Sequence, residues 1–459
     1  MNAIAGFVLI LLLGFAGSRL ALFRGRFSLG LQSIFLAGTE FLFIGVILGP
    51  YAANVLTESA LQRLAPILSL GLGWIGLLIG LQFDRRVVRR IPAAIWWTGA
   101  AISLVCFSTV FLALWSARGL LLRMLPLSFA DDLSWSRFGT LAETSFCVLL
   151  AAASTESTYT ALALAKRRTD ARGETIKLLQ LLTDIRAPLA IIGMGAWYCL
   201  YHISNQGTLS GIIPENASLP NKIMDAPLDG ISLEAFYCPP IMHGGLWLAA
   251  ALLLGVSLGW MLHYLTSERM ESREMLLALT GSVVLSTGLA ASLHLSPLFV
   301  NFIMGATLSN LPNFARGRVS NLLTAMEKPF FVIFMILTGA LLPAITPMAL
   351  AFVSLYLFAR VLGLYAGMRW ANALFLKSKI PILPRLGLAM LPQGGVAIAL
   401  AIDYKLIYPG RWADLALSVA ILSVLVNQLI GPALLMRALR RSGDISAPDW
   451  RNLAKSNSS

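Results

Sequence analysis

Long apolar runs separated by short basic or polar segments dominate the chain, which is 57% hydrophobic and only 12% charged. A helix needs about 20 mostly apolar residues to cross the hydrocarbon core of a bilayer, and thirteen runs come close to that length. The pattern therefore predicts an all-α, polytopic membrane protein with about 13 transmembrane helices. The runs are residues 2–18, 30–50, 64–83, 92–116, 139–165, 177–201, 241–264, 275–293, 296–311, 329–346, 348–368, 386–404 and 413–436.

Basic residues are distributed unevenly between alternate connecting segments. Of the 35 Lys and Arg residues, 26 fall in the segments that would share a side with the C-terminus and 7 in the others. Because basic loops remain on the cytoplasmic side, we expect an outer N-terminus, a cytoplasmic C-terminus and an inner (plasma) membrane location. The first run lacks a basic segment before it, so we expect a span there rather than a signal peptide. Residues 437–459 are expected to form a short cytoplasmic tail.

The composition argues against an enzyme, a metalloprotein or a nucleic-acid-binding protein. The net charge of +13 lies in loops that would face anionic lipid. The four cysteines and four histidines show no metal-ligand spacing. Gly71, Gly73 and Gly76 match a dinucleotide-binding pattern only in part and lie in an all-apolar run, so close helix packing through Gly76 and Gly80 is the better interpretation. We expect no cofactor.

Ionisable residues inside apolar runs are costly and usually functional. Asp184, Glu156 and Arg360 lie deepest in their runs. Glu156 belongs to a dense polar patch, residues 154–158, which a continuous lipid-facing helix would not accept. The patch is explained either by a helix broken at mid-membrane, whose carbonyls and hydroxyls can bind a cation, or by polar packing between helices.

A second break is predicted at residues 391–395, where proline removes a backbone donor and glycine loosens the helix. Each break precedes a run with a polar residue at mid-depth, Asp184 in one case and Asn427 in the other. The two units would enter the membrane from opposite sides. We therefore expect an inverted repeat, about 30–201 and about 275–436, with two broken helices crossing near the bilayer midplane inside one transmembrane domain, 1–436.

Five segments, in order, resemble the monovalent cation/proton antiporter superfamily, in particular its bacterial sodium– or potassium–proton antiporters and their sodium/hydrogen exchanger domain. They cover nearly the whole chain. The match includes both predicted breaks and the run that contains Asp184. The segments are IGLLIGLQFDRRVVRRIP, STESTYTALALAKRR, LLTDIRAPLA, SPLFVNFIMGATLSN with EKPFFVIFMILTGALL, and LAMLPQGGVAIALA.

The resemblance implies roles for particular residues. The ion-binding aspartate of the family corresponds to Asp184, which would bind the transported metal cation and the proton in turn. The basic residue near the crossing corresponds to Arg360. The chain departs from the family at Gln82, Thr183 and Arg186. We expect the cation and proton site to comprise Asp184, Thr183, Thr155, Glu156 and Ser154, the breaks to include Ser157, Pro392, Gln393, Gly394 and Gly395, and Arg360 and Arg186 to compensate charge.

The expected function is exchange of a monovalent cation, Na⁺ or K⁺, for protons across the membrane by alternating access. The resemblance also implies a homodimer. Two alternatives stay open at this point. The chain could be a sodium-coupled symporter of a small organic anion, with Arg186 and Arg360 as anion ligands, or a channel or receptor that does not couple ion fluxes.

Overall fold

The protein is all-helical wherever its structure is described. The computed structural model describes residues 40–123, 137–158, 162–163, 165, 173–202, 240–266, 271–312, 316–376 and 386–442. Its helices are α3 (Glu40–Leu48), α4 (Glu58–Gln82), α5 (Arg85–Val88), α6 (Ala93–Arg123), α8 (Arg137–Thr155), α10 (Glu174–Leu200), α11 (Pro240–Leu265), α12 (Ser272–Ser292), α13 (Pro297–Asn310), α14 (Arg316–Ala340), α15 (Pro347–Ala371), α17 (Gly395–Ile407) and α18 (Arg411–Arg441), with a π-turn at Asn372–Leu376 and a 3₁₀ turn at Gly387–Met390.

Seven helices of the described residues are long and apolar enough to cross a membrane, and each coincides with a predicted run. These are α4, α6, α10, α11, α12, α15 and α18. Four further runs correspond to shorter elements. The run 139–165 contains α8, 296–311 contains α13, 329–346 contains the apolar end of α14, and 386–404 contains the 3₁₀ turn and most of α17. The run at 2–18 lies outside the described residues. The all-α membrane fold is confirmed, and the number thirteen stays a prediction.

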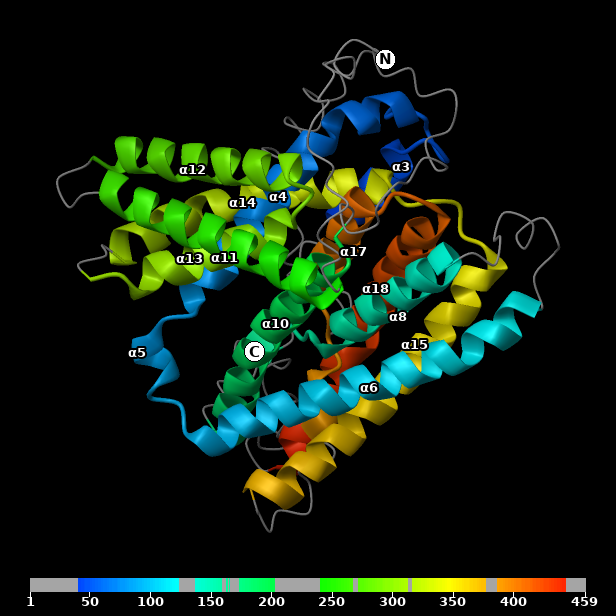
Figure 1. The fold of residues 1–459 in the computed structure, drawn as a ribbon. Helices are drawn as coiled ribbons and strands as arrows, with labels where there is room; N and C mark the ends of the chain where they lie inside the picture. The colour runs from blue at the N-terminus through cyan, green and yellow to red at the C-terminus, as the bar shows by residue number, and fades with distance from the viewer. Residues whose placement is uncertain are drawn as a thin grey trace, which may run out of the picture.

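The helices form two packed groups, visible in Figure 1. Helices α4, α11, α12, α13 and α14 pack together, and α3 joins them through α14. Helices α6 and α15 pack along one another, and with α8, α10, α17 and α18 they form the second group. We call these groups the glycine bundle, for the contact described next, and the core bundle.

Glycines allow the backbones of α4 and α13 to touch. A Cβ atom on Gly76 would lie 2.3 Å from the carbonyl oxygen of Leu298, and one on Gly80 would lie 2.2 Å from that of Phe302. Gly305 makes the reciprocal approach from α13 to α4. The predicted close packing is therefore confirmed. It joins helices of one chain, so the glycines give no reason to expect a homodimer.

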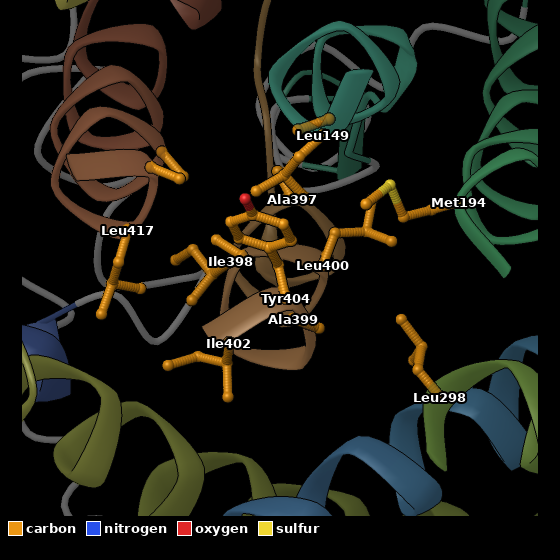
Figure 2. Packing of buried hydrophobic residues seen from close by; sticks show 14 of the residues in the cluster. Leu149, Met194, Leu298, Ala397, Ile398, Ala399, Leu400, Ile402, Tyr404 and Leu417 are labelled. Atoms are coloured by element: carbon orange, nitrogen blue, oxygen red, sulfur yellow. The ribbon is translucent and has the colours of Figure 1, made fainter. Parts of the chain in front are cut away.

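Helix α17 lies between the two bundles. Figure 2 shows its Ala397 and Leu400 surrounded by Leu149 of α8, Met194 of α10 and, from the glycine bundle, Leu298 of α13. Residues 397–404 of this short helix are therefore buried, mostly against apolar side chains. This burial holds the break that precedes α17 deep inside the protein.

The α4–α13 contact yields a first prediction. Gly80→Ala should lower the stability of the folded protein by about 1–3 kcal/mol, because the added methyl group meets main-chain atoms that cannot move aside. Gly281→Ala is the matched control, since a Cβ atom there meets nothing within 4 Å. It should be neutral or slightly stabilising. Thermal unfolding of both variants in detergent tests this, and equal midpoints would contradict the tight contact.

Candidate functional site

The first predicted break is present. Helix α8 ends at Thr155, and residues 156–158 are not helical. The hydroxyl groups of Ser154 and Thr155 donate to carbonyl oxygens of their own helix, Ala151 at 2.6 Å and Ala152 at 2.8 Å. Both side chains are buried together with Glu156 and Ser157. The polar patch is therefore an interior feature and does not face lipid.

The second predicted break crosses the first. The 3₁₀ turn ends at Met390, residues 391–394 are not helical, and α17 begins at Gly395. The backbone N–H of Thr158 donates to the carbonyl oxygen of Pro392 at 3.0 Å. The backbone N–H of Gly394 donates to Oε2 of Glu156 at 2.9 Å. We call residues 153–158 and 391–395 together the crossing.

Fixed charges match the helix ends at the crossing. The Glu156 carboxylate lies at the N-terminus of α17, where the helix dipole favours an anion. Arg360 of α15 lies at the C-terminal end of α8, where the helix dipole favours a cation. Its Nε donates to the carbonyl oxygen of Ser154 at 3.0 Å and its Nη2 to that of Glu156 at 2.8 Å, while Nη1 donates to the carbonyl oxygen of Leu391.

Arg360 thus pairs with main-chain oxygens of both breaks. It is fully buried, and within the described residues it forms no ion pair with the Glu156 carboxylate. These bonds put Arg360 at the crossing, and its role in charge compensation stays a prediction. Since a buried carbonyl without a donor costs about 1–3 kcal/mol, this guanidinium group contributes to the stability of both non-helical segments.

Gln393 connects the crossing to three helices. Its Nε2 donates to the carbonyl oxygen of Ala153 in α8 at 2.7 Å and to the Tyr356 hydroxyl of α15 at 2.8 Å. Its Oε1 accepts from Nδ2 of Asn427 in α18 at 2.7 Å, and its main-chain carbonyl accepts from the Gln428 side chain. The second break is therefore held by neutral amide groups.

The first break is held by polar residues of α10. Nη1 of Arg186 donates to Oγ of Ser157 at 3.3 Å, and the hydroxyl group of Ser157 lies 3.5 Å from that of Thr183. Arg186 is fully buried, and its Nε and Nη2 have no hydrogen-bond acceptor among the residues that the structure describes. Arg186 pairs away from Asp184, because residues two positions apart on a helix do not face each other.

Asp184 differs from its neighbours in having no fixed partner. It lies at mid-length of α10 and is half-buried. Among the residues that the structure describes, no group hydrogen-bonds or ion-pairs with its carboxylate. Pro188, four residues later in the same helix, lacks the N–H that would bond the main-chain carbonyl of Asp184. Asp184 therefore offers carboxylate oxygens and a main-chain oxygen that α10 itself does not use.

A small cavity lies beside this part of α10. Its volume is about 10 Å³, enough for about one water molecule. The cavity lies between α10, which contributes Thr183, and the crossing, which contributes Thr158. The lining residues are Thr158, Leu162, Leu179, Thr183, Ala389, Met390 and Leu435. No group of three or more His, Cys, Asp or Glu residues that could hold a metal ion occurs among the described residues.

A repeat in the sequence marks the two supporting helices. Thr183-Asp184 followed by Pro188 in α10 matches Asn427-Gln428 followed by Pro432 in α18, with the same spacing. Thr183 contacts Ser157 of the first break, and Asn427 and Gln428 bond to Gln393 of the second, whereas Asp184 holds neither break. Gln428 was not predicted, and the proline spacing is the signal that could have identified it.

Asp403 was not predicted, although it is buried at the interface between the bundles. Its Oδ2 accepts from Oγ of Ser296 at 2.6 Å, and Ser296 caps α13 by accepting from the backbone N–H of Phe299 at 3.0 Å. The other carboxylate oxygen, Oδ1, has no hydrogen-bond donor in the structure. An aspartate one residue before the end of the apolar run 386–404 is expected to be an interfacial charge, and its burial depends on a partner remote in sequence.

Comparison with solved structures identifies the fold. The chain is similar to the sodium proton antiporter MjNhaP1 from Methanocaldococcus jannaschii at pH 8, with a TM-score of 0.59 and 16% identity over 95% of this chain and 98% of that one. An electron-microscopy structure of MjNhaP1 matches with a TM-score of 0.57 and 15% identity over 97% and 100%. No family model and no curated protein matches the sequence. The fold expected from the resemblance is therefore confirmed.

The bonds of Arg360 yield a second prediction. Arg360→Lys keeps the charge, but one ammonium group cannot reach the three carbonyl oxygens that the guanidinium fork reaches. With at least one carbonyl left unpaired, the stability of the folded protein should fall by about 1–3 kcal/mol. Arg369→Lys, at the exposed end of the same helix, is the matched control and should have little effect. Thermal unfolding in detergent measures both, and an unchanged midpoint for Arg360→Lys would contradict this role.

Proposed function

We propose that the protein is a secondary active antiporter that exchanges a monovalent cation, Na⁺ or K⁺, for protons by alternating access. The observation that carries the proposal is Asp184, an intramembrane carboxylate without a fixed partner, held beside two crossed helix breaks. A carboxylate in this position is costly unless it binds something. The fold shared with a sodium proton antiporter supports the same conclusion. Transport by this route needs no catalytic group or cofactor.

Competition at Asp184 explains how the two fluxes are coupled. Its carboxylate can hold a proton or a partly dehydrated cation, but not both at once. We propose the hydroxyl group of Thr183 and the main-chain oxygen of Asp184 as further ligands of the cation. Ser154, Thr155 and Glu156, predicted with them, hold the crossing in this conformation because their polar groups are already bonded.

Charge balance favours a one-for-one exchange. With all four groups ionised, the negative charges of Asp184 and Glu156 offset the positive charges of Arg186 and Arg360. One bound proton or one bound monovalent cation then adds the same single charge. Both loaded states of the site are therefore electrostatically equivalent, which supports an electroneutral cycle.

Several parts of the proposal concern the whole molecule. We propose that residues 1–436 form one transport domain built from the two inverted repeats, about 30–201 and about 275–436. The core bundle would move against the glycine bundle and expose Asp184 to each side in turn. We place the protein in the plasma membrane as a homodimer, with its C-terminal tail in the cytoplasm.

A second candidate function, symport of a small organic anion with a cation, is favoured by one observation. Two buried nitrogen atoms of Arg186, Nε and Nη2, have no acceptor among the described residues, and an organic carboxylate could accept from them. Proteoliposome assays with and without organic acids distinguish the candidates. Cation-dependent dissipation of a proton gradient in the absence of any organic acid supports antiport, and flux that requires the acid supports symport.

Asp184→Asn gives the direct test of the antiporter. The amide keeps the shape of the side chain but cannot titrate, so cation-dependent proton flux in proteoliposomes should be abolished. Because no described partner depends on the carboxylate, the thermal unfolding midpoint should stay close to that of the wild type. Glu174→Gln, an exposed position in the first turn of the same helix, should exchange normally. A folded Asp184→Asn variant that exchanges at the wild-type rate would exclude Asp184 as the site.

Glu156 can be tested with two substitutions that separate charge from shape. Glu156→Gln keeps an oxygen that can accept from the Gly394 N–H, whereas Glu156→Ala removes it. If the negative charge balances the site, Glu156→Gln should shift the apparent cation affinity or the pH dependence of flux by itself. Normal kinetics for Glu156→Gln, with lower stability only in Glu156→Ala, would assign Glu156 to packing.

A further inference from the structure

We propose that the cavity between α5 and the end of α13 binds a phosphate group, in the headgroup of an anionic phospholipid or as free phosphate. The cavity has a volume of about 230 Å³. Three arginines line it from one short stretch of chain, and the remaining wall comes from the last two residues of α13 and one carboxylate. The lining residues are Asp84, Arg85, Arg86, Arg89, Ser309 and Asn310.

The backbone of this basic stretch is held in place from both ends. The backbone N–H of Arg85 donates to Oδ1 of Asn310 at 2.8 Å, and Nδ2 of Asn310 donates to the carbonyl oxygen of Phe83 at 2.9 Å. At the other end, the indole N–H of Trp96 lies 3.4 Å from the carbonyl oxygen of Val88. The arginines are thus presented by a fixed turn, which lowers the conformational entropy lost on binding a ligand.

The guanidinium groups are available to a ligand. Arg85, Arg86 and Arg89 are exposed, and within the described part of the chain none of them forms an ion pair. Asp84, the carboxylate in the lining, is buried, and its Oδ1 accepts from the backbone N–H of Arg86 at 2.7 Å. Arginine presents paired N–H groups that match the oxygens of a phosphate or a carboxylate, and three of them around one cavity can together bind the several oxygens of one phosphate group.

The place of the cavity in the fold points to the membrane surface. It lies where α4 and α13 end, and the segment 84–91 is one of the basic segments predicted to face the cytoplasm. Basic pockets at this depth can bind anionic headgroups. If the arginines served only to orient the chain in the membrane, charge in the loop would be enough, and neither a cavity nor an anchored turn would be needed. Arg90, which shares the loop and does not line the cavity, provides the comparison.

Binding to the purified full-length protein in neutral detergent tests the proposal, with phosphatidylglycerol, phosphatidylcholine and inorganic phosphate as separate probes. The variants are the triple R85Q/R86Q/R89Q, the charge-preserving triple R85K/R86K/R89K, and R90Q as the matched control. Phosphatidylglycerol should bind more tightly than phosphatidylcholine. Both triple variants should lose about ten-fold or more in affinity, because lysine keeps the charge but not the paired donors. R90Q should stay within about two-fold of the wild type.

The outcomes separate the sources of phosphate and the alternatives. Competition by inorganic phosphate at millimolar concentration identifies free phosphate as a ligand, and its absence identifies the headgroup. If the lysine triple binds with wild-type affinity, or if R90Q loses as much affinity as the glutamine triple, the proposed arginine site is wrong. Binding would then reflect only the net positive charge of the loop. The lysine triple also covers the case in which the glutamine triple fails to insert. Asp184→Asn should bind the lipid normally, so this result is independent of the proposed transport activity.

Discussion

A membrane-embedded chain cannot leave main-chain carbonyl groups unpaired, and the rest of this structure depends on how that constraint is met at the crossing. Each helix break removes intrahelical partners at a depth where water is scarce. Arg360 replaces them with one planar group that reaches both breaks. With the guanidinium group bonded to the backbone, Asp184 has no counter-ion among the described residues, which is the feature on which the proposed cation site depends.

Much of this arrangement could be predicted from the sequence, because apolar runs and their interruptions are local signals. The long spans follow from run length, and both breaks follow from a polar patch and from a Pro–Gly segment inside otherwise apolar runs. Asp184 and Arg360 stand out as charges in such runs. The placement of Arg186 away from Asp184 follows from helix geometry.

The remainder depends on partners that are remote in sequence. Nothing near Glu156 indicates that its carboxylate will accept from Gly394, because that bond requires two segments more than 200 residues apart to cross. The Asp403–Ser296 bond has the same character, since it joins the two bundles. The glycines of α4 predict close helix packing, but the sequence does not say which helix is the partner. The structure shows that it is α13 of the same chain.

Gln393 has a mechanical consequence. Its amide and main-chain carbonyl are bonded to α8, α15 and α18 at once, so neither break can shift without carrying the other and the helices that support them. If the protein works by the proposed alternating access, the crossing would move as a rigid body, and the resistance would arise at the apolar surface between the bundles and in the surrounding lipid. Bilayer thickness and lateral pressure would then affect the rate of the proposed transport.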